Sequence, residues 1–484
     1  MKIKKIAIVG GGTAGLIAAT ILKRRFDIVV DIIFSEKIGI IGVGEGSTEH
    51  FKEYIDFVGI RQYDLIQKCN ATYKSGIMFE GWGENPYLHS VVPVFDKNFS
   101  QYSYVYARQI SKNQDYFNYK TIWNSKINKW FLNREEEYPF FQFHFDTYKL
   151  NEFLLNFSSE LGVGLIKDDI VDVRLSDDGS IDKIIGNKST YDYDFYIDAT
   201  GFNKILIGKM GAKWCSFGKY LKMNSAITFQ TPDEENYNLW TLSKAMDAGW
   251  LFRIPTWGRY GNGYIFDDRY IDVNQAQQEV QKHFDREIEI GKKFNFDPGY
   301  LEAPWIKNCC AIGLSGSFVE PLEATSIGTS IQQSFLLMHR LINYDESIIK
   351  SYNKSFKSIM ENIRDFIVLH YITRKNNTLF WRDIKNIALP DSLEYNLNLW
   401  KNKLPINEDF HNSSDYILFK SKNFILVMAG LELFDREKIL QEYNQNYQYV
   451  KDDAENTIDQ LITFENTIKT IKHKDMIKFI RNLI

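Results

Sequence analysis

A glycine-rich turn near the N-terminus is the sequence feature that most constrains the fold. The apolar run of residues 5–9 ends at Gly10-Gly11-Gly12, and from Thr13 the apolar residues recur with helical spacing. A second extended run over residues 28–34 completes a strand–helix–strand unit. This pattern predicts an α/β fold that begins with a parallel sheet of the Rossmann type.

The spacing Gly10-x-Gly12-x-x-Gly15, with Glu36 after the second strand, is typical of dinucleotide binding. The glycines let backbone N–H groups approach a pyrophosphate at the positive end of the helix. Glu36 would accept hydrogen bonds from the adenosine ribose, and an acidic residue there argues against a 2′-phosphate. We therefore expect NAD or FAD at this turn, with Thr13 and Ala14 also at the cofactor.

Two later segments end in the same way and favour FAD. A strand over residues 194–198 leads to Ala199-Thr200-Gly201, and a second strand over residues 310–314 leads to Ser315-Gly316. Small residues at such turns let further loops reach the same dinucleotide, so we expect contributions from Asp198, Gly201, Gly313 and Ser315. The three segments together resemble an FAD-binding monooxygenase scaffold. Buried strands with purely structural glycine turns stay an alternative for the two later segments.

Composition excludes several classes of protein. Lys plus Arg number 58 against 62 Asp plus Glu, with no strongly basic block, so we expect no nucleic-acid partner. No apolar run is long enough to span a bilayer and no secretion signal begins the sequence, which predicts a cytoplasmic protein without a membrane partner. The four cysteines lack C-x-x-C spacing, so we expect reduced, mostly buried thiols and no metal site.

We expect one composite flavoprotein over residues 1–484, since no internal repeat or flexible linker interrupts the chain. The predicted FAD-binding module combines residues 1–86, 150–213 and 301–335. The predicted substrate module combines residues 87–149, 214–300 and 336–484. It contains an additional β-sheet and, from about residue 335, a mostly helical C-terminal region.

Over about residues 3–400, six blocks in order resemble the flavin-dependent halogenases of the tryptophan-halogenase type. The blocks are Gly10-Gly11-Gly12-Thr13-Ala14-Gly15, Ile41-Gly42-Val43-Gly44-Glu45-Gly46-Ser47, Ala71-Thr72-Tyr73-Lys74-Ser75-Gly76-Ile77, Phe143-His144-Phe145-Asp146, Gly249-Trp250-Leu251-Phe252-Arg253-Ile254-Pro255 and Phe318-Val319-Glu320-Pro321-Leu322-Glu323. Generic flavin monooxygenases share the first block but not those of Lys74 and Trp250. The resemblance implies that reduced FAD and oxygen form a flavin hydroperoxide, which oxidises a halide ion to hypohalous acid for electrophilic halogenation of an aromatic substrate.

The resemblance also implies the residues that react. Without it, Lys74 would read as a solvated lysine and Glu323 as a carboxylate that favours a helix start. By resemblance, Lys74 carries or orients hypohalous acid, either as an ammonium hydrogen-bond donor or as a haloamine. Glu323 accepts the ring proton or helps to position the acid. Glu45 is expected at the cofactor.

Two further sites follow from the same resemblance. Backbone N–H groups at Thr325 and Ser326 are expected to hold the halide at a helix start. Ala324 and Ser326 replace a serine and a glycine that are usual in the family, so we expect bromide, and also iodide, to compete with chloride. A wall of Trp250, Phe252, Ile254 and Pro255 should separate substrate from flavin, with Phe252 in place of a usual tryptophan.

A single dinucleotide motif leaves no evident site for NAD(P)H, so a separate flavin reductase is implied. Residues after about 400 lack the aromatic and polar clamp expected of enzymes that bind free tryptophan. We expect a more open pocket for an indole, a phenol or a larger aromatic compound. A flavin-dependent hydroxylase without halogenating activity and a non-catalytic flavoprotein remain alternatives, distinguished by the pair Lys74 and Glu323.

Overall fold

A computed structural model describes residues 3–39, 45–91, 105–110, 124–128, 142–410, 413–467 and 469–483. Residues 41–44 of the second family block lie outside the described residues, as do parts of the expected substrate module between residues 92 and 141. All the predicted site residues lie within them. The described ranges contain no helix that is long and apolar enough to cross a membrane.

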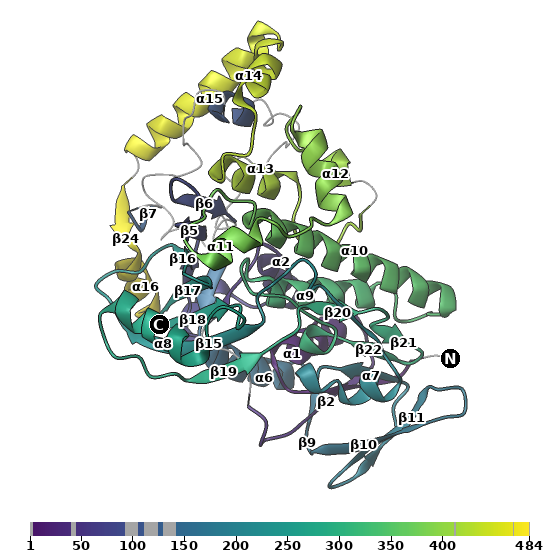
Figure 1. The fold of residues 1–484 in the computed structure, drawn as a ribbon. Coiled ribbons are helices and arrows are strands. Elements are labelled where there is room, and N and C mark those ends of the chain that lie inside the picture. Colours follow the sequence, from purple (N-terminus) through teal and green to yellow (C-terminus); the bar gives the residue numbers. More distant parts are fainter. Residues whose placement is uncertain are drawn as a thin grey trace.

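A six-stranded sheet joins the three segments that the sequence assigned to one sheet (Figure 1). Its order is β21 (Trp305–Ile306), β22 (Cys309–Ala311), β13 (Phe195–Asp198), β1 (Lys5–Val9), β2 (Val29–Phe34) and β9 (Gly164–Lys167). All neighbouring strands run parallel except β21 and β22. The central strands are apolar and almost completely buried, as expected for a parallel sheet covered on both faces. The predicted α/β class is confirmed.

A seven-stranded sheet forms the expected additional sheet. Its order is β19 (Lys292–Asn295), β15 (Ser225–Pro232), β18 (Arg259–Phe266), β17 (Gly249–Thr256), β16 (Trp240–Ala245), β5 (Gly76–Glu80) and β6 (Tyr87–Ser90). All pairs are antiparallel except β16 and β5. The expected module boundary at residue 86 therefore falls between β5 and β6, two strands that pair in one hairpin of this sheet.

The structure also contains four smaller sheets among the described residues. One contains β3 (Glu45–Gly46), β8 (Gln142–Phe145) and β4 (Thr72–Lys74), with β8 in the middle, and another pairs β7 (Lys126–Asn128) with β24 (Thr470–Lys472). The other two are β10 (Ile170–Leu175), β11 (Ile181–Gly186) and β12 (Thr190–Tyr191), and β14 (Trp214–Ser216), β20 (Gly299–Leu301) and β23 (Ser317–Phe318). The first sheet places Lys74 on an edge strand.

Helices cover the sheets and make up most of the C-terminal region, as predicted (Figure 1). Besides helical residues 105–110, they are α1 (Thr13–Arg25), α2 (His50–Val58), α3 (Gln62–Lys68), α6 (Thr147–Glu160), α7 (Ile205–Lys209), α8 (Val273–Phe284), α9 (Thr325–Met338), α10 (Glu346–His370), α11 (Leu379–Ile384), α12 (Asp391–Trp400), α13 (Ser421–Gly430), α14 (Arg436–Asn444), α15 (Gln448–Thr467) and α16 (His473–Arg481). One apolar core includes side chains from both large sheets and from α9 and α10.

Candidate active site

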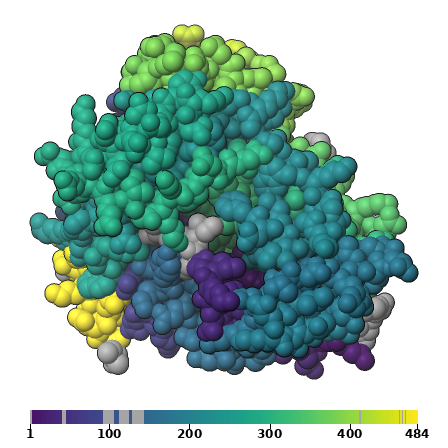
Figure 2. Space-filling view, turned by 60° about the horizontal axis from the view of Figure 1, so that its bottom comes forward, coloured from purple at the N-terminus to yellow at the C-terminus, as the bar shows by residue number. Residues whose placement is uncertain are grey.

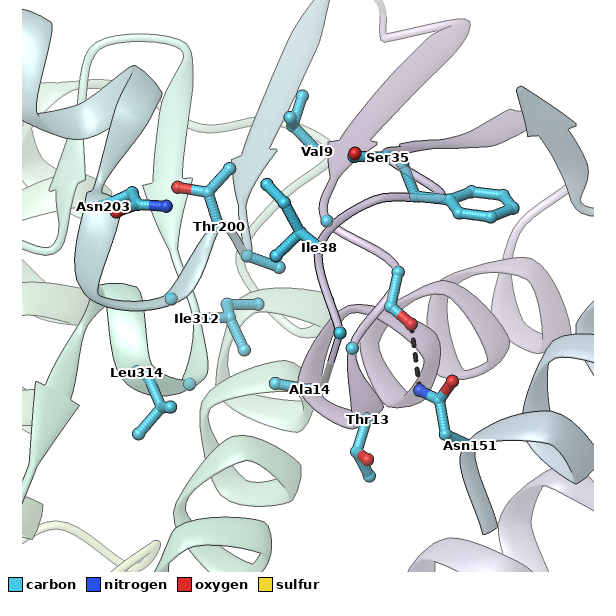
Figure 3. Close-up of a pocket in the computed structure, with 18 of the residues that line it drawn as sticks. Val9, Thr13, Ala14, Ser35, Ile38, Asn151, Thr200, Asn203, Ile312 and Leu314 are labelled. Atoms are coloured by element: carbon cyan, nitrogen blue, oxygen red, sulfur yellow. Dashed lines mark hydrogen bonds between the residues drawn. The ribbon is translucent and has the colours of Figure 1, made fainter. Parts of the chain in front are cut away.

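A cavity of about 810 Å³ opens at the carboxyl ends of β1, β2 and β13 and beside the turn after β22 (Figure 3). Its wall includes Gly10, Gly12, Thr13, Ala14, Glu45, Gly201 and Gly313 from the predicted cofactor set, together with Ser326 from the predicted halide set. In Figure 3, Thr200 and Ile312 lie across the cavity from Ser35. Figure 2 shows the purple N-terminal segment on this side of the molecule, between teal and blue parts of the chain. Ligands of open parallel sheets bind at this edge.

The first turn of α1 makes this cavity suited to an anion. Gly12 precedes the helix and offers no side-chain cap, so the first N–H groups of α1 have no side-chain acceptor there. An added Cβ at Gly12 would meet no protein atom within 4 Å, because it would extend into open space. An added Cβ at Gly15 would instead overlap the carbonyl oxygen of Gly10. Gly12 thus leaves room for a ligand, whereas Gly15 is needed for helix–strand packing.

We expect Gly12→Val to raise the Kd for FAD by at least about tenfold and to shift the melting temperature by less than about 2 °C. Its side chain would occupy space that the pyrophosphate needs, without touching the protein. Gly15→Ala is the matched variant, and its clash with Gly10 should lower the melting temperature by several degrees. Fluorescence titration with FAD and thermal unfolding check both. Unchanged FAD affinity in Gly12→Val would refute the pyrophosphate assignment.

Four predicted cofactor residues do not line the cavity: Gly15, which packs against Gly10, and Glu36, Asp198 and Ser315. Glu36 is exposed, and its carboxylate pairs with Lys167 Nζ at 2.7 Å, because Lys167 lies on the neighbouring strand β9. Asp198 is buried and accepts hydrogen bonds from the N–H groups of Thr200, Leu206 and Ile207. Ser315 donates to the Asp198 carboxylate and lies 3.2 Å from the Gly201 carbonyl. Asp198 and Ser315 therefore hold the two glycine turns in place.

The cavity also contains side chains that the sequence interpretation missed. Lys37, Asp168 and Asp169 line it near the end of β2, and Lys37 pairs with Asp169 at 2.5 Å. Asn151 of α6 donates to the Gly11 carbonyl at 2.9 Å and so supports the glycine turn (Figure 3). No spacing rule predicts Asn151, because it comes from a helix 140 residues away in the sequence.

A smaller cavity of about 140 Å³ adjoins the first, since Glu45, Phe202, Leu314, Ser326 and Ile327 line both. Trp250, Phe252 and Ile254 alternate along β17 and form one wall of it. Pro255 is not on this wall, because alternation turns it away, and its carbonyl accepts a hydrogen bond from Thr72. Burial raises the pKa of Glu45 to about 7.

The start of α9 reaches the junction of the two cavities. Ala324 has a left-handed backbone with φ of 54°, and no side-chain hydrogen bond caps the helix. Ser326 lines both cavities, whereas Thr325 is buried and lines neither. Uncapped N–H groups at this junction form a place for a small anion.

Lys74 is fully buried and lies behind Gly46 of the smaller cavity. Its Nζ donates to the Ser47 carbonyl at 2.8 Å, and a Cβ added to Gly46 would come within 2.9 Å of that nitrogen. Burial lowers the pKa of Lys74 to about 8, although the charge of Glu323 opposes this. Within the described part of the chain, Lys74 and Glu323 form no ion pair closer than 4 Å. They interact only at longer range.

Glu323 is bound by two buried histidines rather than by the start of α9. His89 Nδ1 lies 2.7 Å from Oε2 and His370 Nε2 lies 2.9 Å from Oε1. Burial alone would raise the pKa of Glu323, but the interactions with His89 and His370 outweigh it and lower the pKa to about 2. The carboxylate is therefore ionised and fixed in orientation.

The histidine contacts also place the protons. His370 Nδ1 lies 2.8 Å from the Phe366 carbonyl, which can only accept, so Nδ1 bears a ring proton and Nε2 faces the Glu323 carboxylate. Asn423 Nδ2 lies 3.1 Å from His89 Nε2, which leaves the Nδ1 proton of His89 for Glu323.

Sequence interpretation missed His89, His370 and the role of Glu320. Glu320 is buried, and its Oε2 accepts hydrogen bonds from Trp250 Nε1 at 2.8 Å and from Tyr371 at 2.6 Å, which anchors the wall. Burial raises the pKa of Glu320 to about 7. The position of Glu320 in the same sequence block as Glu323 could have indicated that it belongs to the site. His370 gave no such indication, because it lies 47 residues from Glu323, at the end of α10, whereas Glu323 lies in the turn before α9.

Comparison with known proteins identifies the family of this chain. Residues 5–444 match the family described as tryptophan halogenase. The chain belongs to the tryptophan halogenase family. Tryptophan 6-halogenase SttH of Streptomyces toxytricini is 30% identical over 84% of this chain and 85% of its own, and tryptophan 7-halogenase RebH of Lentzea aerocolonigenes is 28% identical over 89% and 90%. A solved flavin-dependent halogenase from Xanthomonas campestris superposes with a TM-score of 0.86 at 25% identity, covering 99% of this chain and 98% of that one.

Membership of this halogenase family makes the chain an FAD-dependent enzyme that halogenates an aromatic substrate, as the resemblance implied. The residues present fit the cofactor, because the larger cavity has an uncapped helix start, an open position at Gly12 and three converging strand ends. The four cysteines are free and mostly buried, which confirms the predicted thiols. Among the described residues, no cluster of His, Cys, Asp and Glu has the geometry of a metal site.

Proposed function

We propose that this halogenase uses Lys74 and Glu323 to transfer an electrophilic halogen from hypohalous acid to an indole-type or phenol-type ring. When bound in the larger cavity, reduced FAD with oxygen supplies the oxidising power that converts halide to hypohalous acid. The residues proposed to hold it are Gly10, Gly12, Thr13, Ala14, Glu45, Gly201 and Gly313. The first turn of α9, at Thr325 and Ser326, is proposed to hold the halide.

The proposed transfer balances without any further reactant. The ring carbon forms a bond to halogen while the halogen–oxygen bond breaks, and the departing oxygen takes a proton from the Lys74 ammonium to leave as water. The ring proton then passes to the Glu323 carboxylate, which releases it to solvent, and the lysine regains its proton from solvent. Lys74 donates one of its three N–H groups to Ser47, which leaves two donors for the acid.

One observation carries this proposal: a buried ammonium lies behind Gly46 of the small cavity, and a buried, ionised carboxylate lies between Leu322 and Ala324, which line the same cavity. Two oppositely charged groups of this kind supply the acid and the base of aromatic substitution. A hydroxylase has no use for this pair, and neither does a non-catalytic flavoprotein.

The test is a reaction with FAD, a flavin reductase, NADH, oxygen and either chloride or bromide, with a panel of indoles and phenols. We expect a mass increase of one halogen minus one hydrogen on at least one aromatic compound. Hydroxylated products without halogen, at either halide, would favour the monooxygenase alternative. Flavin binding with no product from any substrate would favour the non-catalytic one.

The family generally needs a separate flavin reductase, and we propose that one supplies reduced FAD here. The named relatives act on tryptophan, according to their names. For this chain we propose a more open substrate site, formed mainly by residues 87–149, 214–300 and 336–484, next to a cofactor module of residues 1–86, 150–213 and 301–335. The cytoplasmic location stays a prediction.

We expect bromide to be used at least as well as chloride. Heavier halides are less strongly hydrated, so their entry into a desolvated site costs less free energy. Ala324 also lacks the hydroxyl usual at this position, and Ser326 faces the cavities directly. Competition between equal concentrations of the two halides should give at least as much brominated as chlorinated product.

Ala324→Ser is the matched variant for the halide prediction. It restores the hydroxyl next to the start of α9 and should move the product ratio toward chloride. Iodide is expected to be accepted as well in a separate reaction. Predominant chlorination by the unmodified enzyme would contradict the prediction and would show that this helix start still selects the smaller anion.

A further inference from the structure

The C-terminal segment binds the strand that carries Lys74. Strand β4 (Thr72–Lys74) is an edge strand whose partner β8 lies on one side only. On the other side, the Tyr73 N–H donates to His473 Nε2 at 3.0 Å. Tyr73 and His473 are 400 residues apart in the sequence, and both are buried. A histidine from the last helix thus takes the place of a neighbouring strand beside the catalytic lysine.

The direction of this hydrogen bond is determined by the second ring nitrogen. His473 Nδ1 lies 3.2 Å from the Tyr237 carbonyl, which only accepts, so Nδ1 bears the ring proton. Nε2 is therefore left as an acceptor for the Tyr73 N–H. The ring also stacks on the Tyr73 ring, at a centroid distance of 6.2 Å and an angle of 26°. Burial lowers the pKa of His473 to about 3, which keeps the ring neutral.

Several contacts keep His473 in place. Strand β24, which immediately precedes His473, pairs with β7. The backbone N–H of His473 donates to the Ser125 carbonyl at 3.0 Å. Lys472 pairs with Glu235 at 2.8 Å and Lys474 pairs with Asp233 at 2.6 Å. Figure 1 shows β24 and α16 together at the edge of the molecule, and Figure 2 shows the yellow C-terminal segment beside the teal part of the chain. The imidazole is therefore presented by a firmly attached segment.

Polar groups of Thr72 in β4 and of Ser75, the residue that follows β4, are also hydrogen-bonded. Thr72 Oγ1 donates to the Pro255 carbonyl at 2.7 Å, and Ser75 donates through its N–H and its hydroxyl to the Leu239 carbonyl. Loss of His473 would take this buried acceptor away from the Tyr73 N–H, which costs free energy until the strand shifts. A shift of about 1 Å at a catalytic group can lower a rate by about 100-fold.

We propose that His473 is a positioning residue that keeps Lys74 aligned for halogen transfer by accepting the Tyr73 N–H. This inference rests on the proposed role of Lys74. It makes the C-terminal segment, from Thr470 to Arg481, a part of the active-site support rather than a peripheral extension. His473 itself touches neither substrate nor cofactor.

The decisive measurement is coupling, the moles of halogenated product formed per mole of reduced FAD oxidised. His473→Phe keeps the ring shape but removes the acceptor. We expect its coupling to fall at least about tenfold, while FAD affinity and flavin oxidation stay within twofold of the unmodified enzyme. An added β-diketone should trap the hypohalous acid that no longer reaches substrate. General destabilisation would lower flavin oxidation and product together.

Arg481→Met is the matched control. Arg481 Nη1 donates to the Ile66 carbonyl at 2.6 Å and so attaches the other end of α16 without touching β4. We expect this variant to melt at a lower temperature but to keep its coupling. Hydrogen–deuterium exchange of a peptide that contains Tyr73 should speed up in His473→Phe and not in Arg481→Met. Equal loss of coupling in both variants would overturn the proposal, because docking of the helix as a whole would then explain it.

Two more variants apply if His473→Phe does not fold. Gln places an amide oxygen close to the position of Nε2, whereas Asn is too short, so coupling in His473→Gln should exceed that in His473→Asn. Equal coupling in the two overturns the proposal. Failure of the proposed function looks different: the unmodified enzyme would then give no halogenated product, or Lys74→Ala would still halogenate. An inactive Lys74→Ala with full coupling in His473→Phe refutes only the role of His473.

Discussion

Lys74→Ala should lower the yield of halogenated product by at least about 1000-fold while FAD binding and flavin oxidation remain intact. Lys74 is buried behind Gly46, outside both cavity walls, so its removal should leave the cofactor site unchanged. What disappears is the donor that polarises hypohalous acid. Mass spectrometry of the product, flavin fluorescence and the rate of flavin oxidation check the three parts of this prediction.

Lys244→Met is the control for a lost lysine charge. Lys244 lies on β16 of the neighbouring sheet, where its Nζ pairs with Glu80 at 3.5 Å. This variant should halogenate at a rate close to that of the unmodified enzyme. If Lys74→Ala still halogenates at the normal rate and position, the proposed mechanism is wrong.

The pH profile separates the two chemical roles considered for Lys74. Burial lowers its pKa to about 8, so the ammonium dominates below this pH and the free amine above it. If the ammonium donates to hypohalous acid, product formation should fall as the pH rises through about 8. If the free amine first forms a haloamine, product formation should rise over the same range. Measuring coupling at each pH removes the effect of pH on flavin oxidation.

Glu323→Gln should lower the rate of halogenation by about 100-fold to 1000-fold, with a much smaller change in KM for the aromatic substrate. The amide oxygen can accept from His89 and the amide nitrogen can donate to His370, so the hydrogen bonds are preserved. The variant removes the charge and the proton acceptor while keeping the shape. Single-turnover measurements with added hypohalous acid would isolate this step.

Glu320→Gln is the matched control for Glu323. Glu320 is a buried glutamate three residues earlier, and burial raises its pKa to about 7, so an amide changes its charge less at neutral pH. We expect a loss of at most about tenfold, attributable to the altered contact with Trp250. Equal losses of halogenation rate in Glu323→Gln and Glu320→Gln would contradict the prediction. They would show that the reaction requires a buried carboxylate at either position rather than Glu323 as the proton acceptor.

The sequence by itself determined the fold class, the cofactor edge and the family. Gly10, Gly12 and Thr13 could be placed at the edge of the sheet, where they line the larger cavity, because a tight turn between strand and helix obeys local rules of backbone conformation. Trp250, Phe252 and Ile254 could be placed on one wall because alternation along a strand is a local property. Lys74 and Glu323 followed only from the resemblance, since neither residue stands out in composition or spacing.

Only the tertiary structure decided which polar groups meet. Glu36 pairs with Lys167 and Asp198 supports two turns, because segments distant in the sequence bring competing partners to both of them. His370 reaches Glu323 from α10, and His473 reaches Tyr73 across 400 residues. Hydrogen bonds between distant segments depend on where the sheets and helices pack, and no local pattern encodes that placement.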